Sequence, residues 1–429
     1  MASTTYSSEN TTPRLLDRLV SIRAGEGWLV FWAFLYLFAV FTAYYVIRPI
    51  RDEAGVAGGV SNLSWLFTGT LIAMLAVNTP FGALVSRLPR SRFIGITYRF
   101  FILNLLVFIA LFRGATGDAN IWIGRAFFIW AAVFNLFVVS VFWAFMADVF
   151  STEQGKRLFG FIAAAATLGG IAGASVTAST AKTLGVPTLL LGAAALLELG
   201  VFASRRLGAL TAAFSQVGGP SDDAQIIGGN AWAGLTHVMK SPYLLGIAGY
   251  MLLYTILSTF LYFQQAEIVD HTFASRADRT VFFARVDLYV NLLTLFGQGF
   301  LTGKVLQRAG VALTLTFVPA ITAVGFLCLG IAPTVAIVIG FTVLRRAGNF
   351  AFARPTREVL FTSLSREDKY KAKNFIDTVV YRFGDQVGAW SSSFITAAGL
   401  GAGAVAWAAV PLSVLWMANA WWVGRRHSR

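Results

Sequence analysis

The sequence is short of the residues that form covalent cross-links and metal sites. It holds one cysteine, Cys328, and three scattered histidines, His237, His271 and His427. A disulfide within the chain and a cysteine-based metal cluster are therefore excluded, and nothing favours a histidine metal site. The sequence also lacks a catalytic triad and a Walker phosphate loop, so we expect neither an enzyme nor a cofactor.

Charged residues are scarce as well. They make up 13% of the 429 residues, about half of the roughly 25% that is usual in soluble proteins. Hydrophobic residues make up 57%, and the mean hydropathy is +0.68. Such a chain cannot hide its apolar surface in one water-soluble core, so lipid must be the solvent for much of it. The expected fold class is an all-α membrane protein.

Apolar runs of sufficient length to cross a bilayer recur along the whole sequence. A transmembrane helix needs about 20 apolar residues. No cleavable signal precedes the first run, which we expect to remain as a membrane anchor. Twelve segments are predicted to span, near 27–48, 62–85, 94–113, 120–147, 158–181, 185–204, 242–264, 280–303, 312–330, 333–353, 374–396 and 402–424.

Basic residues predict how these spans are oriented. Lysine and arginine concentrate in every second loop, and the opposite loops carry few of them. Cytoplasmic loops carry such an excess, so both termini should lie in the cytoplasm, with the protein in a bacterial inner membrane. The same placement accounts for the net charge of +14 without a nucleic-acid partner, because anionic lipid headgroups suffice.

A polar segment divides the spans into two groups of six. Residues 205–241 are rich in glycine, serine and aspartate, as linkers are. We therefore expect an N-terminal six-helix half at 1–204, a cytoplasmic linker at 205–241 and a C-terminal six-helix half at 242–429.

The two halves resemble each other. STEQGKRLFGF precedes the fifth span as SREDKYKAKNF precedes the eleventh, with Glu153 and Glu367 at corresponding positions. Arg48 ends the first span as Gln264 ends the seventh, and almost the same length of chain separates this second pair. The near-constant offset indicates duplication and predicts the major facilitator architecture. FGALVSRLPRSRF, at 81–93, resembles the loop between the second and third spans of that superfamily.

One segment carries a more specific resemblance. RPTREVLFTSLSREDKYKAKNFIDTVVYRFGD, at 354–385, resembles a loop and helix of the ATP/ADP translocase family, the nucleotide exchangers of plastids and intracellular bacteria. YYVIRPIRDE, at 44–53, is similar to the exit of that family's first span. The resemblance implies nucleotide exchange. Exchangers of the family rely on lysine and glutamate within spans, whereas the candidate spans here carry arginines, and their one glutamate is Glu198.

Polar residues on the first, fourth, seventh and tenth spans are candidates for substrate binding, because these spans line the cavity in facilitator proteins. Arginine binds phosphate or carboxylate through two hydrogen bonds, and tyrosine stacks on rings. For Arg48 and Arg125 the alternative is snorkelling to the outer interface, and for Tyr44 and Tyr45 it is an aromatic belt. The predicted binding residues are Tyr44, Tyr45, Arg48, Arg125, Tyr254, Gln264 and Asn349.

The eleventh span carries charges on one polar face, so we expect that face to be turned towards protein or water. Arg382 is three residues before Asp385, within side-chain reach, and Asp377 should pair with Arg345 or Arg346. A gate or coupling role is predicted for these five residues, and the alternative is a static ion network that fixes helix packing.

A second group of charges is expected near the outer ends of the first, seventh and eighth spans. They form either an outer latch or, taken singly, a solvated surface. The residues concerned are Arg51, Asp52, Glu267, Arg285 and Asp287.

These patterns predict a monomeric secondary transporter that moves an organic anion by alternating access, with ATP/ADP exchange as the specific hypothesis. One alternative is a proton-coupled transporter of another amphipathic or anionic solute, for which a proton is a further partner. The others are a lipid flippase, which needs a hydrophobic cavity, and a membrane-embedded enzyme.

Overall fold

The structure is a computed structural model that describes residues 22–23, 26–87, 90–215, 238–239, 241–362, 364 and 372–427, without the side chains of 78–92, 152, 156, 212–215 and 402. Most of the predicted linker and the side chains of nearly all of the basic loop at 81–93 therefore lie outside the described residues. Every regular element in the described part is a helix, which confirms the all-α class.

The N-terminal half is built of long helices. They are α2 (Gly27–Ala57), the short η1 (Val60–Asn62), α3 (Leu63–Arg87), α4 (Arg90–Gly114), α5 (Asp118–Val149) and α6 (Thr152–Ser215).

The C-terminal half has more breaks. It contains α8 (Pro242–Thr272), α9 (Arg276–Phe296), η2 (Gly297–Leu301), α10 (Thr302–Ile331), α11 (Val335–Gly348), η3 (Asn349–Ala353), α12 (Arg354–Leu360), η4 (Ile376–Val380), α14 (Tyr381–Ala397) and α15 (Gly401–His427). Three of these elements, η2, η3 and η4, are single π-helical turns, which are frequent at functional sites.

Nine helices among the described residues are long and apolar enough to cross a membrane. Two of the nine contain a reversal at a glycine, Gly185 (φ 72°, ψ 167°) and Gly310 (φ 72°, ψ 177°). Glycine lacks a Cβ and adopts this left-handed φ without strain. The predicted eleventh span, 374–396, is not among the nine, because its charged and polar residues, Asp377, Arg382 and Asp385 among them, keep its hydropathy too low.

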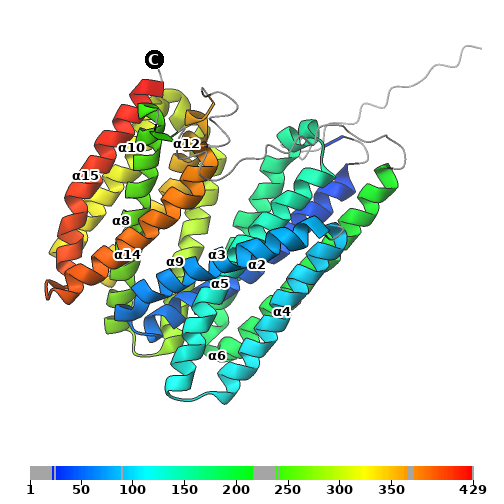
Figure 1. Cartoon of the computed structure of the whole chain (residues 1–429), viewed down its shortest axis with the longest axis horizontal. Helices are drawn as coiled ribbons and strands as arrows, with labels where there is room; N and C mark the ends of the chain where they lie inside the picture. Colours follow the sequence, from blue (N-terminus) through cyan, green and yellow to red (C-terminus); the bar gives the residue numbers. More distant parts are fainter. Residues whose placement is uncertain are drawn as a thin grey trace, which may run out of the picture.

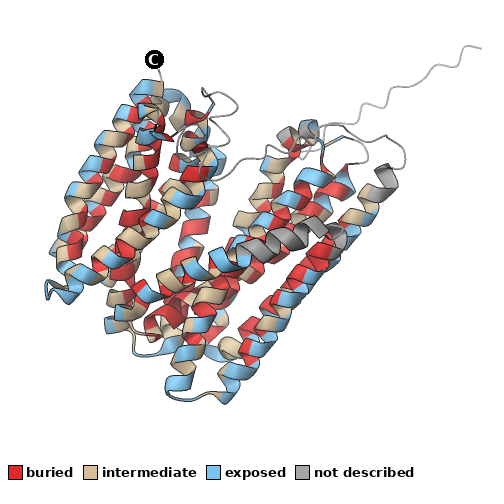
Figure 2. Ribbon diagram, in the orientation of Figure 1, coloured by how far each residue is buried: buried red, intermediate tan, exposed pale blue. Residues whose placement is uncertain are grey.

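The two halves form separate groups of helices that meet at one end (Figure 1). The groups diverge towards the end at which the C terminus lies. α9 contacts α2 and α6 of the other half, and α14 contacts α3. Buried residues line the interior of each group, and exposed residues cover its outside (Figure 2).

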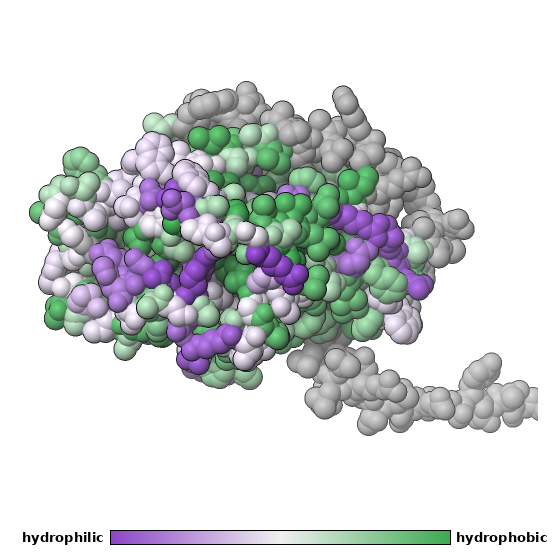
Figure 3. All heavy atoms as spheres, turned by 90° about the horizontal axis from the view of Figure 1, so that it is seen from below, coloured by the Kyte–Doolittle hydropathy of each residue, from purple (hydrophilic) through white to green (hydrophobic). Residues whose placement is uncertain are grey.

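Large hydrophobic side chains lie on the outside of both groups, as lipid contact requires. Trp28 is 67% exposed, Phe100 is 58% exposed and Phe394 is 76% exposed. At the end where the halves meet, hydrophilic residues form patches among hydrophobic ones (Figure 3). Water-facing polarity at this end and an apolar outside fit a protein that is embedded in a bilayer.

The same close helix crossing occurs once in each half. A Cβ on Gly169 would lie 2.6 Å from the Phe38 carbonyl oxygen in α2, and Gly173, one turn on, also touches α2. Gly384 and Gly388 of α14 are spaced in the same way and approach α8 just as closely. Small residues let helix backbones approach closely in membranes. These glycines therefore serve packing, and their matching spacing supports the duplication.

Candidate substrate site

A cavity of about 330 Å³ lies between the two halves. Its volume falls at the lower end of the range of small-molecule sites, roughly 300–1,000 Å³. Its lining has a formal charge of +2, since it contains five arginines and three aspartates. These are Arg48, Arg51, Arg345, Arg346, Arg382, Asp52, Asp287 and Asp385.

Arg345 is a buried cation with only neutral partners among the described residues. It is 2% exposed and donates hydrogen bonds to the Tyr254 carbonyl (3.0 Å), the Ser258 hydroxyl (2.8 Å) and the Thr322 hydroxyl (3.2 Å). Its guanidinium carbon lies 5.0 Å from the centre of the Tyr254 ring and 5.9 Å from that of Trp416. A buried charge without a counter-charge is costly, so this position favours an anion in the cavity.

The neighbouring Arg346 faces a different element. Successive residues of an α-helix point about 100° apart, so Arg345 reaches α8 and α10 while Arg346 reaches α9. There Arg346 makes an ion pair of 2.8 Å with Asp287. The two adjacent arginines thus contribute two separate guanidinium groups to one cavity.

Ion pairs close the end of the cavity at which the halves meet. Asp287 of α9 also pairs with Arg48 of α2, at 3.2 Å. Asp52 pairs with Arg51 at 2.8 Å and accepts a hydrogen bond of 3.1 Å from the Tyr262 hydroxyl of α8. Both contacts, Arg48–Asp287 and Tyr262–Asp52, cross between the halves.

The latch interpretation of these charges is therefore supported for part of the group. Asp52 is 5% exposed and Asp287 is 2% exposed, so a solvated surface is wrong for both. Arg51 lines the cavity with them. Arg285 is exposed and Glu267 is half-buried, and neither is among the lining residues.

Two further ion pairs join the halves at this end, and no pattern in the sequence indicated them. Arg276 makes two hydrogen bonds with Glu53, at 2.7 and 2.9 Å, and Lys182 pairs with Asp278 at 2.5 Å. Glu53 is 1% exposed. Since α9 supplies Arg276, Asp278 and Asp287, this helix takes part in all three ion pairs between the halves that the described residues show.

The charges of the eleventh span are placed partly as expected. Arg382 and Asp385 form the predicted pair, at 3.3 Å, and both line the cavity. The expected partner of Asp377 was wrong, because Asp377 pairs with Arg357 of α12 at 3.2 Å. It lies in the π-turn η4, outside the cavity lining and close to α12, whereas Arg345 and Arg346 point into the cavity.

Of the seven predicted binding residues, Tyr44, Arg48 and Tyr254 line the cavity. Tyr45, Arg125, Gln264 and Asn349 do not. Arg125 instead donates a hydrogen bond of 2.8 Å to the Gly58 carbonyl, at the end of α2, and its guanidinium lies 4.5 Å from the Trp122 ring. Gln264 and Tyr45 are buried in helix packing, and Asn349 begins η3. Glu198 pairs with Arg99, outside the cavity lining, at 2.5 Å.

Several lining residues were missed although a helical spacing marks them. In α8, residues 254, 258, 262 and 265 follow one another at intervals of three or four, which places Tyr262 and Gln265 on the face of Tyr254. In α2 the same spacing joins Arg51 to Tyr44 and Arg48. In the eleventh span the same spacing joins Tyr381 to Asp385 and Gln386 to Arg382, whereas Asn135 was missed without any such signal.

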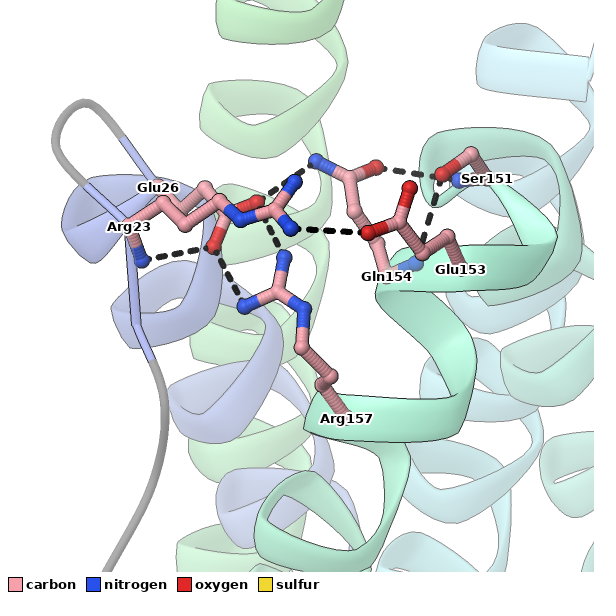
Figure 4. A network of polar contacts seen from close by, with 6 residues as sticks. All are labelled: Arg23, Glu26, Ser151, Glu153, Gln154 and Arg157. Carbon is pink, nitrogen blue, oxygen red and sulfur yellow. Dashed lines mark hydrogen bonds and ion pairs between the residues drawn. The ribbon is translucent and has the colours of Figure 1, made fainter. Parts of the chain in front are cut away.

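A separate network fixes the other end of the N-terminal half (Figure 4). Glu26, just before α2, accepts two hydrogen bonds from Arg157 (2.8 and 3.2 Å) and one from Gln154 (3.1 Å). Hydrogen bonds from Arg157 are the main reason that the pKa of Glu26 is lowered to about 2. Arg23 pairs with Glu153 at 2.8 Å.

The start of α6 is itself capped within this network. The Ser151 amide donates to the Gln154 side chain (3.0 Å), and the Gln154 amide donates to the Ser151 hydroxyl (3.3 Å). This is the reciprocal capping box that the pattern S-x-x-Q permits. All six residues in Figure 4 belong to the N-terminal half, so the network binds α2 to α6 and does not join the halves.

Comparison with known proteins finds a family match for the C-terminal half. Residues 230–427 match the family described as TLC ATP/ADP transporter. The "ADP,ATP carrier protein 2" of Chlamydia pneumoniae is 27% identical over 173 residues, which cover 35% of this chain and 32% of that protein. The match thus spans about a third of the length of this curated relative. The resemblance to the ATP/ADP translocase family is confirmed, and this is a family of transporters, not of enzymes.

Solved structures establish the fold. The chain is similar to a bacterial homologue of the human lysosomal transporter Spinster, with a TM-score of 0.54, 13% identity and coverage of 93% of this chain and 98% of that one. The TM-score to a POT family transporter in complex with 5-aminolevulinic acid is 0.60, with 10% identity and coverage of 93% of this chain and 96% of that one. A bacterial homologue of the iron transporter ferroportin also gives 0.60, with 13% identity and coverage of 91% and 98%. The fold is of the major facilitator type.

Proposed function

We propose, from the match of its C-terminal half to the TLC ATP/ADP transporter family, that the chain is a secondary transporter that moves an organic anion by alternating access. Exchange of nucleotides across a bacterial inner membrane is the specific form that this family suggests. The cavity between the halves is the proposed binding site.

The observation that carries this proposal is the unbalanced charge of the cavity. Five arginines face three aspartates, and the deeply buried Arg345 has only neutral partners among the described residues. Intramembrane ionisable residues usually mark a substrate path. Arg345 binds the anionic group of the substrate, and the Tyr254 ring beside it offers a stacking surface for a base or another ring.

The proposed topology has twelve spans with both termini in the cytoplasm. Of the nine candidate spans in the described residues, two are each divided at a left-handed glycine, and η4 with α14 supplies one more. The halves diverge towards the end that holds the C terminus (Figure 1). With that end in the cytoplasm, as the basic loops indicate, the structure is inward-facing.

Proton-coupled transport is the second candidate, and Asp385 is the observation behind it. Its side chain is 13% exposed, lines the cavity and pairs with Arg382, so a titratable carboxylate stands beside the substrate site. A lipid flippase is not favoured, because a cavity with eight charged lining residues does not suit acyl chains.

Ligand binding to the purified protein tests the proposal. ATP and ADP should bind in titration calorimetry at constant ionic strength, and adenosine, which lacks phosphate, should not. Arg345→Gln should weaken nucleotide binding by about 100-fold, because loss of one partner from a buried charged contact costs roughly 2–5 kcal/mol. The matched control is Arg285→Gln, which removes an exposed arginine outside the cavity and should leave binding unchanged. Equal binding of adenosine and ATP would contradict the assignment of the arginines to the anionic group.

A further inference from the structure

Asp287 occupies an unusual position in the cavity wall. One of its carboxylate oxygens, Oδ1, forms ion pairs with the Nη1 of Arg48, at 3.2 Å, and with the Nη1 of Arg346, at 2.8 Å. The other, Oδ2, is buried and has no hydrogen-bond partner in the described part of the chain. The Nη2 of Arg346 is also buried and has no partner there. One carboxylate is therefore shared between two guanidinium groups, and hydrogen-bonding capacity is left over on both sides.

This arrangement leaves an incomplete ion network in the cavity. A guanidinium binds a carboxylate or phosphate best through two parallel hydrogen bonds, whereas each arginine here contacts Asp287 through the single oxygen Oδ1. Buried ion pairs offset their desolvation only when the remaining donors and acceptors are satisfied. A phosphate can offer separate oxygens to the two arginines, whereas Asp287 meets both through Oδ1 and leaves Oδ2 without a partner in the described part of the chain.

We propose that Asp287 is an internal counter-anion, which holds Arg48 and Arg346 when the cavity is empty and is displaced from them by the anionic group of the substrate. This inference rests on the proposed function and names the residue that couples binding to movement. The substrate competes with Asp287 for the same two guanidinium groups.

The position of Asp287 connects this competition with the closed end of the cavity. Asp287 lies on α9 of the C-terminal half, and Arg48 lies on α2 of the N-terminal half. Their ion pair is one of the contacts that hold the two halves together. An anion that takes Arg48 away from Asp287 removes this contact and weakens the closed end. Without an anion the contact remains and the carrier stays closed, which makes transport an exchange and prevents a leak.

A merely positioning role for Asp287 predicts the opposite change in affinity. If Asp287 only orients the arginines, its loss loosens them and weakens substrate binding. If Asp287 competes with the substrate, its loss frees the arginines and strengthens binding. The sign of the change in Kd therefore separates the two roles.

The test is the affinity of Asp287→Asn for ATP, measured by titration calorimetry at fixed ionic strength. We expect the Kd to fall at least about fivefold, the lower end of typical coupling effects. The matched control is Asp278→Asn, the same change on the same helix, at an ion pair with Lys182 that also joins the halves but lies outside the cavity lining. The control should bind ATP as the wild type does. An unchanged or higher Kd for Asp287→Asn overturns the inference.

A cross-link at the closed end provides a second measurement that does not require the Asp287 variant to fold. Glu53→Cys and Arg276→Cys replace an ion pair between the halves, in a background with Cys328→Ser. We expect ATP to slow disulfide formation between the two positions, and adenosine to have no effect. If ATP binds but leaves the rate of disulfide formation unchanged, this contradicts the inference about Asp287 and leaves the proposed function standing. No binding of any nucleotide to the wild type contradicts the proposed function instead.

Discussion

The degree of burial determines how strongly a charged residue of this cavity depends on its partner. The Arg382–Asp385 pair of the eleventh span is an example. Arg382 and Asp385 are 3.3 Å apart, with side chains 36% and 13% exposed. The sequence predicted this pair, because a spacing of three residues on a helix brings the two side chains together whatever surrounds them. Long-range partners behave differently. The pairing of Asp287 with Arg48 and Arg346 depends on how α9 packs against α2 and α11, and no local spacing reports that.

Substitution of the Arg382–Asp385 pair separates a static role from a gate. Asp385→Asn and Arg382→Gln should each lower the free energy of unfolding by about 1–3 kcal/mol, less than the roughly 3–5 kcal/mol of a fully buried pair, because water screens the partly exposed arginine. The double variant should regain stability, since no charge remains unpaired. Thermal unfolding in detergent measures the stability, and uptake into proteoliposomes measures transport.

The combined outcome of the three variants decides between the two roles. If the pair is a gate, the double variant regains stability but not transport. If it regains both, the pair is purely structural. Two single variants with wild-type stability and transport would show that the pair contributes nothing.

At the scale of helices, the sequence predicted where the elements lie better than how they are joined. The apolar runs correspond to the observed helices, because the required length of a span is fixed by the bilayer. The pairing of Asp377 with Arg357 was missed because α12 and η4 are brought together across residues that no helical period connects. The close crossings at Gly384 and Gly173 follow from small residues one turn apart, a pattern that is visible in the sequence.

A methyl group at these crossings should force helices apart. A Cβ on Gly384 would clash with the Thr255 hydroxyl, and a Cβ on Gly173 would clash with the Thr42 carbonyl. Gly384→Ala and Gly173→Ala should each cost about 1–3 kcal/mol of stability, as overpacking does. The control, Gly340→Ala in α11, has open space around the new methyl group and should be neutral or stabilising by up to about 1 kcal/mol. Equal melting temperatures for the three variants would contradict the packing role.

The contacts of Glu26, at the start of α2, predict that the stability of the protein depends on pH. The pKa of Glu26 is lowered to about 2 from an ordinary 4.5, so the folded state binds its proton less readily than the unfolded state does. The stabilisation is therefore complete above about pH 4.5 and is lost as the pH falls from there towards 2. Glu26→Gln should melt at a lower temperature than the wild type at pH 7, and the difference should shrink between pH 4.5 and 3. A difference that is independent of pH would show that the charge of Glu26 is not involved.

The whole molecule combines two groups of helices (Figure 1) with an interface that contains several ion pairs. The sequence predicts two six-span halves and their duplication, because each half repeats the landmarks of the other at a nearly constant offset, and both stay predictions. The sequence does not predict how the two halves tilt relative to each other. This tilt depends on contacts such as Glu53–Arg276 and Lys182–Asp278, whose members lie on different halves and far apart in the chain. An interface of ion pairs suits alternating access, because a charged ligand can compete for its members.

Exchange across a membrane tests the central claim most directly. Proteoliposomes that contain the wild-type protein should take up labelled ADP when they are loaded with ATP, and should take up little when they are empty inside. Arg345→Gln should abolish this uptake, and Arg285→Gln should preserve it. Uptake that is equal with and without internal nucleotide, or that survives in Arg345→Gln, would contradict anion exchange through the arginine-lined cavity.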